Sequence, residues 1–213
     1  MKTTDPWKLA ATPRLIPGLA LVVASMLALF LVPHEYFVVA TFVSTSCMMG
    51  AAYGLGGLRV ARRPRTTSLV IGVLTAALLY LIFYLGGAAI DTLHPFGISS
   101  AAEESIYALI ASPSNPLYLQ VGLLFFDSAG YESFFRGVLQ HRLQATIGVA
   151  AAPAVALIDA GLHIATLNPV WVAGTFFTDL IWGLTYHYGK GTQASFTSHL
   201  VWDLIIFVVL PVK

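Results

Sequence analysis

The sequence predicts an all-α fold: a polytopic membrane bundle of about seven transmembrane helices with one short amphipathic surface helix. Composition is the first reason, because 57% of the 213 residues are hydrophobic and only 10% are charged, whereas soluble domains carry about 25% charged residues. The mean hydropathy of +0.79 points the same way. The third reason is a succession of apolar runs, most of them close to the roughly 20 residues that a membrane helix needs.

The first three apolar runs are residues 15–32, 36–55 and 68–90. The first is too long for a signal peptide and no small-residue cleavage site follows it, so we interpret it as a retained helix. The second carries Gly50 and Gly54, a small-residue spacing that predicts close helix packing. None of the three holds a charged residue between its ends.

A polar segment without lysine or arginine follows, over residues 91–116. Apolar residues recur in it at helical spacing from Ile98 to Ile110. We therefore predict an amphipathic helix on the membrane surface at residues 98–112. The sequence leaves open whether this helix gates a site or covers it.

The last four apolar runs are residues 117–140, 147–167, 170–188 and 194–212. We interpret the chain as a single membrane domain, residues 1–213. Within it, residues 1–115 form the scaffold helices and the outer amphipathic segment, and residues 116–213 form the core.

Basic residues collect on one predicted side of the membrane. Four arginines lie in the break at residues 59–65, which is typical of a topology determinant. If the N-terminus is cytoplasmic, that side receives every lysine and arginine except Lys213. The positive-inside rule therefore predicts an integral cell-membrane protein with a cytoplasmic N-terminus and an outer C-terminus.

Composition also restricts the partners and the chemistry. A net charge of +1 argues against nucleic acid, because phosphate binding needs a basic face. The single cysteine, Cys47, excludes an internal disulfide or a cysteine-based metal cluster. We expect membrane lipids as partners and no nucleic acid.

Ionisable residues within apolar runs are confined to the last four runs. Such groups cost roughly 2.5–3.5 kcal/mol each at the centre of a membrane helix, so they usually face a bundle interior and have a function. Carboxylates and imidazoles in neighbouring helices suit proton transfer with a water molecule, or a metal site. The residues are Asp127, Glu132, Arg136, Asp159, His163, Asp179, His199 and Asp203.

Three pairs among these residues are four positions apart, so the members of each pair share a helix face. A carboxylate beside an imidazole can fix the tautomer of the ring. The pairs are Glu132 with Arg136, Asp159 with His163, and His199 with Asp203.

Depth along the helices predicts which of these groups meet. Counted at about 1.5 Å per residue, Asp127, Asp159 and His163 lie at similar depth. His199 is shallower, so a tilted helix or a re-entrant bend would be needed to bring it to the same site.

The motifs in successive helices resemble those of the CAAX-protease and bacteriocin-processing (CPBP, Abi) family of intramembrane endopeptidases. That family shows Glu-Glu-x-x-x-Arg, then Phe-x-x-x-His, then His-x-x-x-Asn or Asp. The similarity covers roughly residues 127–211. The corresponding segments here are Tyr131-Glu132-Ser-Phe-Phe-Arg136, Asp159-x-x-x-His163 and His199-x-x-x-Asp203.

The resemblance implies that a peptide or membrane protein is hydrolysed by an activated water, without a cofactor. In the family, the first glutamate and the histidine of the second motif activate the water, so His163 would have the latter role. His199 with Asp203 would stabilise the oxyanion. Glu132 and Arg136 would form an orienting ion pair.

Two positions depart from the family pattern: the first glutamate is Tyr131, and the phenylalanine of the second motif is Asp159. A phenol, with a pKa of about 10, is a poor general base at neutral pH. Asp127 lies one helical turn from Tyr131. Asp127 or Asp159 is therefore a candidate for the missing carboxylate, and Glu132 is a third.

Two other interpretations stay open. One is a metal-dependent membrane hydrolase in which Asp127, Asp159, His163 and His199 bind zinc. The other is a catalytically silent relative, a pseudoprotease that binds or shields membrane peptides, which Tyr131 favours.

Overall fold

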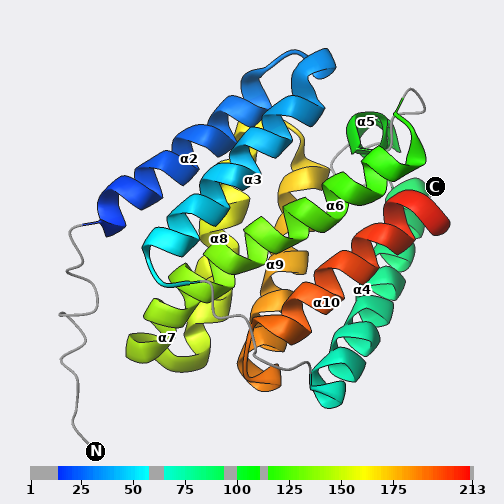
Figure 1. Ribbon diagram of the computed structural model, residues 1–213. Coiled ribbons are helices and arrows are strands. Elements are labelled where there is room, and N and C mark those ends of the chain that lie inside the picture. Colours follow the sequence, from blue (N-terminus) through cyan, green and yellow to red (C-terminus); the bar gives the residue numbers. More distant parts are fainter. Residues whose placement is uncertain (1–13, 58–64, 94–99, 111–114, 212–213) are drawn as a thin grey trace, which may run out of the picture.

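The computed structural model describes residues 14–57, 65–93, 100–110 and 115–211, which form a bundle of helices (Figure 1). Within these residues there is no strand, so the predicted all-α membrane bundle is confirmed. The α-helices are α2 (Leu15–Leu31), α3 (Phe37–Gly54), α4 (Thr66–Leu93), α5 (Ser100–Ile110), α6 (Leu117–Tyr131), α7 (His141–Ile147), α8 (Ala151–His163), α9 (Pro169–Gly189) and α10 (Thr192–Leu204). Two π-helical segments extend α6 and α10, namely η3 (Glu132–Gln140) and η6 (Ile205–Val209). The 3-10 turns are η1 (His34–Tyr36), η4 (Gly148–Ala150) and η5 (Ile164–Thr166).

Each of the seven predicted spans corresponds to a helix, and α5 lies within the predicted surface segment. Four helical stretches of the described chain are long and apolar enough to cross a membrane: His34–Gly54, Thr66–Ala89, Leu117–Thr166 and Thr192–Val209. The third stretch contains two predicted spans, because helical turns join α6 to α8. The count of seven spans is therefore approximate.

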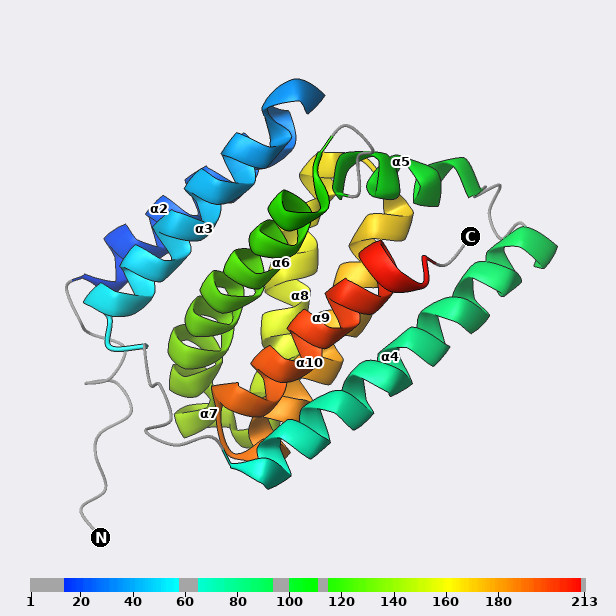
Figure 2. The ribbon, with the colours of Figure 1, turned by 45° about the vertical axis from the view of Figure 1, so that its right-hand side comes forward.

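The core helices α6, α8, α9 and α10 run side by side, with the α2–α3 pair on one flank and α4 on the other (Figure 2). Helix α5 lies across one end of the bundle, and α7 lies at the opposite end (Figure 1). The start of α2, the start of α4 and the connection from α9 to α10 lie at the end that holds α7 (Figure 1). Arg14 and Arg65 directly precede α2 and α4, Arg142 is in α7, and Lys190 follows α9. Most of the predicted arginine break, residues 58–64, lies outside the described residues.

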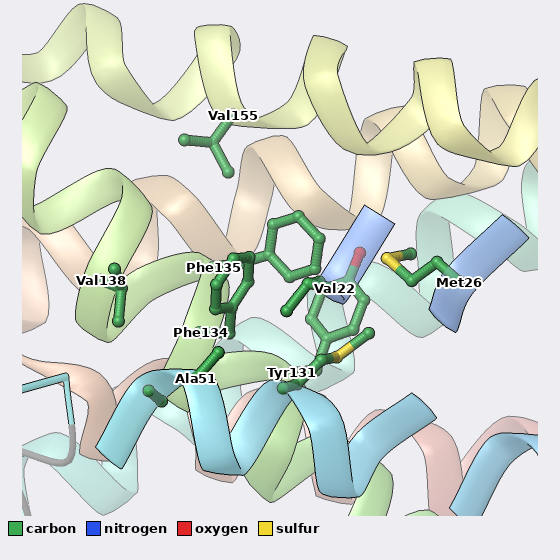
Figure 3. Packing of buried hydrophobic residues seen from close by; sticks show 10 residues of the cluster. Val22, Met26, Ala51, Tyr131, Phe134, Phe135, Val138 and Val155 are labelled. Carbon is green, nitrogen blue, oxygen red and sulfur yellow. The ribbon is translucent and has the colours of Figure 1, made fainter. Parts of the chain in front are cut away.

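Two apolar clusters hold the bundle together. The first joins α2, α3, the α6–η3 helix and α8, and it contains Tyr131 and Phe135, whose rings stack with centroids 4.4 Å apart (Figure 3). The second joins α4, α9 and α10 through Leu79, Trp182 and Trp202. The ring centroids of Tyr131 and Trp182 are 6.5 Å apart, so the two clusters meet in the middle of the bundle.

The fourth predicted span is not a uniform α-helix. It is α-helical to Tyr131 and π-helical from Glu132 to Gln140. In a π-helix residue i bonds to residue i+5, and such segments are frequent at functional sites. The 3.6-residue period that predicts depth and facing therefore stops applying at Glu132.

Close helix approach occurs at glycines of the α6–η3 helix. A Cβ on Gly130 would lie 3.0 Å from the carbonyl oxygen of Thr45 in α3, and a Cβ on Gly137 would collide with the backbone that follows α3. The predicted close packing at Gly50 and Gly54 is wrong, because nothing lies within 4 Å of a Cβ at either position. Within α6, Gly130 is the residue at which α3 approaches closely.

Asn168 defines the start of α9 and ties α5 to it. Its Oδ1 accepts hydrogen bonds from the backbone N–H groups of Val170 and Trp171, as an N-cap residue does. Its Nδ2 donates to the Ala102 carbonyl oxygen at 2.7 Å and to Ser105 Oγ at 3.1 Å, both in α5. One amide therefore fixes the position of the surface helix relative to a core helix.

Candidate active site

A cavity of about 210 Å³ lies where the two apolar clusters meet. Most of its wall is apolar, and Ile106, Tyr107 and Ile110 of α5 contribute to it. Five of the predicted site residues line the cavity: Asp127, Tyr131, His163, His199 and Asp203. Three further helices of the first half contribute: α2 through Phe30, α3 through Thr41 and Ser44, and α4 through Phe83.

His199 lies between two carboxylates. Its Nδ1 is 3.1 Å from Glu132 Oε1 on η3, and its Nε2 is 3.5 Å from Asp203 Oδ2. Only the first contact is a hydrogen bond. The Ser128 hydroxyl donates to the same Asp203 oxygen at 3.2 Å. Trp182 stacks on the imidazole with ring centroids 3.7 Å apart and planes inclined by 14°, so the ring is held on its edges and on one face.

Arg136 is completely buried on η3, and its closest partner is Asp179 of α9. The predicted contact with Glu132 is present at 3.7 Å, but in the described part of the chain neither Glu132 Oε2 nor Arg136 Nε has a hydrogen-bond partner. Arg136 also donates to Gln140 Oε1 at 3.2 Å. The closer partner comes from another helix, so the contact with Asp179 depends on how η3 packs against α9. Arg136 thus joins η3 to α9 more directly than it pairs with Glu132.

Tyr131, Asp159 and His163 form a second polar group, which joins α6 to α8. The Tyr131 hydroxyl donates to Asp159 Oδ2. His163 Nδ1 is 3.0 Å from the Asp159 carbonyl oxygen and 3.6 Å from Asp159 Oδ1. The His163 ring packs against the Phe30 ring, with centroids 4.7 Å apart.

Asp127 is paired across the bundle with α3. Thr45 Oγ1 donates to Asp127 Oδ1 at 2.7 Å. The close approach at Gly130 makes this contact possible, because it brings the Thr45 backbone against α6. The ionisable residues of the apolar runs all lie in the last four predicted spans, so a partner from α3 was not predicted. That partner is the Thr45 hydroxyl.

The structure brings most of the predicted site residues together, but in two groups. Glu132, His199 and Asp203 form one, and Asp159 with His163 belongs to the other, joined by Tyr131. The Tyr131 and His199 ring centroids are only 5.3 Å apart, so the groups touch. His199 therefore reaches the site without a re-entrant bend.

Three predicted residues, Glu132, Arg136 and Asp159, are buried without lining the cavity. Further polar and aromatic residues contact the predicted ones, and four of them, none assigned to the site by sequence reasoning, lie directly against a motif residue or Asp127. Only Asp179 carried a signal, as a carboxylate within an apolar run. These residues are Thr45, Ser128, Asp179 and Trp182.

The four proposed zinc ligands do not form a metal site. In the part of the chain that the structure describes, no three side chains of His, Cys, Asp or Glu are grouped so that they could hold an ion. His199 faces a carboxylate at each ring nitrogen, and one Asp127 oxygen is bound to Thr45. The donors therefore point to protein partners.

Residues 113–205 match the family model described as type II CAAX prenyl endopeptidase, Rce1-like. The matched segment contains all three motifs quoted above, so the resemblance is confirmed over these residues. Neither a curated protein nor a solved structure matches the chain.

Proposed function

From the premise that residues 113–205 share the pattern of the Rce1-like type II CAAX prenyl endopeptidases, we propose that the protein is an intramembrane endopeptidase. It hydrolyses a peptide bond of a membrane-associated peptide or membrane protein. One observation supports this proposal most: residues of all three motifs, together with Asp127, line a single cavity with mostly apolar walls. Ionisable groups inside a membrane bundle usually have a function.

His163 is the proton acceptor of the proposed reaction. Its Nδ1 lies against a carbonyl oxygen, which can only accept, so Nδ1 carries the ring proton and Nε2 has a free lone pair. Water gives a proton to Nε2 while its oxygen forms a bond to the scissile carbonyl carbon, and the carbonyl π electrons move to the carbonyl oxygen. When the tetrahedral intermediate collapses, the C–N bond breaks and the leaving nitrogen takes the proton from Nε2.

Asp127 is the carboxylate that orients the water. Among the three candidates for the missing glutamate, Glu132 and Asp159 do not line the cavity, whereas Asp127 does. Thr45 binds one of its oxygens, and the other is left for water. Asp127 therefore supplies from one turn earlier the carboxylate that the family carries at position 131.

His199 faces the developing oxyanion. Its Nδ1 is bound to Glu132, while Nε2 is too far from Asp203 for a hydrogen bond. When both nitrogens carry protons, Nε2 can donate to the oxyanion. Glu132 and Asp203 then balance the charge of the ring.

The apolar wall suits substrates with apolar segments. A prenylated peptide is the substrate in the name of the matched family, and for this chain it is one substrate class to test beside peptides without a lipid. We also propose that the end with α7 faces the cytoplasm, because Arg14, Arg65, Arg142 and Lys190 lie there.

The test is cleavage by purified protein in lipid vesicles, with prenylated and unmodified membrane peptides as substrates. We expect His163→Ala and His199→Ala to abolish turnover while the thermal unfolding midpoint stays measurable. His34→Ala is the matched control, because His34 is exposed and does not line the cavity. Unchanged turnover in either site variant would contradict the proposal.

Tyr131 favours one second candidate, a catalytically silent peptide-binding relative. In that case the wild-type protein would bind the same membrane peptides without cleaving any of them. The proposed reaction also uses no metal, so a chelator should leave turnover unchanged. Stoichiometric zinc in elemental analysis, with activity lost on chelation, would favour a metal hydrolase.

A further inference from the structure

The two positions that depart from the family motifs contact each other. Tyr131 is at the position of the first glutamate, Asp159 at that of the phenylalanine, and the Tyr131 hydroxyl donates to Asp159 Oδ2. The two residues come from different helices, α6 and α8, and both side chains are buried. A buried carboxylate requires a donor, and a buried phenol requires a partner. Each departure therefore satisfies the other.

The second oxygen of Asp159 has no hydrogen-bond partner among the described residues. Oδ1 is buried and lies 3.6 Å from His163 Nδ1. That distance is too long for a hydrogen bond, and Nδ1 is already bound to the Asp159 carbonyl oxygen at 3.0 Å. An unpartnered carboxylate oxygen thus lies beside the ring nitrogen that becomes positively charged when His163 takes a second proton.

Neither residue reaches the cavity with a reactive atom. Asp159 is fully buried and does not line the cavity, so it has no path to a water there. Tyr131 lines the cavity, but its hydroxyl is directed to Asp159. Their position permits an effect on His163 and excludes direct contact with the attacked peptide bond.

We propose that Tyr131 and Asp159 are paired positioning residues for His163. Tyr131 fixes one oxygen of Asp159, and the other oxygen then stabilises the imidazolium that forms when Nε2 accepts the proton of water. The proposal rests on the function proposed above and adds two roles to it. Asp127 remains the carboxylate that orients the water, and Asp159 on α8 supports the imidazole that takes its proton.

Kinetics of conservative variants test the proposal. We expect Asp159→Asn to lower kcat by about 10–100-fold, as removal of a carboxylate that orients a functional histidine commonly does. KM should stay within a factor of two or so, because Asp159 does not contact the substrate. Tyr131→Phe should lower kcat by about 2–10-fold, the equivalent of one hydrogen bond. Tyr186→Phe is the control, because it removes a phenol that contacts His141 outside the site.

The double variant separates positioning from independent effects. If Tyr131 acts only through Asp159, its hydroxyl should no longer contribute to kcat once the Asp159 carboxylate is removed. Tyr131→Phe with Asp159→Asn should then lower kcat no further than Asp159→Asn alone. Multiplied losses in the double variant, or a loss that appears in KM instead of kcat, would overturn the proposal.

An exchange of both residues supplies a readout that does not need activity. Tyr131→Glu alone places a second carboxylate beside Asp159, and Asp159→Phe alone leaves a buried hydroxyl without an acceptor. We expect each single variant to lower the thermal unfolding midpoint and the double variant to unfold at a higher temperature than either. A double variant no more stable than the weaker single one would show that the residues are not paired. This result can be read even if no substrate is cleaved, so failure of the pairing and failure of the proposed function are distinguishable.

Discussion

The two histidines of the site are held in different ways. His199 faces a carboxylate at each nitrogen, and Trp182 covers its face. His163 has one nitrogen against a backbone carbonyl and one carboxylate nearby, and its ring contacts Phe30. The surroundings of His199 suit a charged ring that donates, whereas those of His163 suit a neutral ring that accepts. A histidine can therefore act as a charged donor in one polar group of the site, as His199 does, and as a base in the other, as His163 does.

The largest expected effect concerns Arg136, which lies 3.7 Å from Glu132, the carboxylate that is bound to His199. Arg136→Met leaves the buried carboxylates of Asp179 and Glu132 without their counter-charge, which should destabilise the protein by about 3–5 kcal/mol. Asp159→Asn, on the His163 side, should cost far less, because within the described residues Asp159 pairs with no lysine or arginine, only with the Tyr131 hydroxyl and with His163, which is 3.6 Å away and neutral before it takes the proton of water. Equilibrium unfolding in mild detergent measures both.

A second substitution identifies the cause of the Arg136 effect. Asp179→Asn added to Arg136→Met removes one of the stranded charges and should recover part of the lost stability. If the double variant is less stable than Arg136→Met alone, the charge argument fails. If Asp159→Asn costs as much as Arg136→Met, the two sides of the site do not differ as described.

A smaller effect is expected where α3 meets α6. Gly130→Ala places a methyl group against Thr45, so α3 must move away and the Thr45 bond to Asp127 lengthens. We expect a loss of about 1–3 kcal/mol, typical of overpacking. Both histidine environments should survive, because neither depends on Thr45. Gly122→Ala in the same helix is the matched control, since a Cβ there meets nothing within 4 Å. Thermal unfolding measures both variants. Equal unfolding midpoints for Gly130→Ala and Gly122→Ala would contradict the close approach of α3 to α6.

The smallest effect concerns the tryptophan ring that lies next to each histidine. Trp182→Leu removes a ring stacked on His199, and a charged ring should lose about 0.5–2 kcal/mol of stabilisation. That corresponds to roughly a 2- to 30-fold drop in kcat/KM. Trp171→Leu, next to His163, should cost less, because the ring centroids are 6.0 Å apart and the planes inclined by 48°. A reversed order would indicate that His163, not His199, carries the charge.

The sequence predicted what depends on one helix at a time. Helix positions follow from hydropathy, and the i,i+4 spacing placed Asp159 beside His163 and His199 beside Asp203, as ion-pair distances of 3.6 and 3.5 Å confirm. Backbone geometry fixes such neighbours whatever surrounds the helix.

The sequence did not predict the contacts between helices. Tyr131 with Asp159, Arg136 with Asp179, and Thr45 with Asp127 are separated by 28, 43 and 82 positions. Such contacts depend on how each helix is rotated and how closely it approaches its neighbour, which hydropathy does not specify. The π-helical turn at Glu132 adds a rotation that an α-helical period cannot give. The choice of Asp127 over Glu132 as the cavity carboxylate follows from these same features.

The oxygen and the nitrogen of the Asn168 amide bind different helices, and this links the movements of those helices. Oδ1 closes the first turn of α9, and Nδ2 tethers α5. Because α9 also carries Asp179 and Trp182, a pull on the surface helix is transmitted through one rigid planar group to the helix that braces both Arg136 and His199. Asn168→Asp would keep the helix start and remove the two hydrogen bonds to α5, so it would loosen α5 while its apolar contacts with the bundle remain.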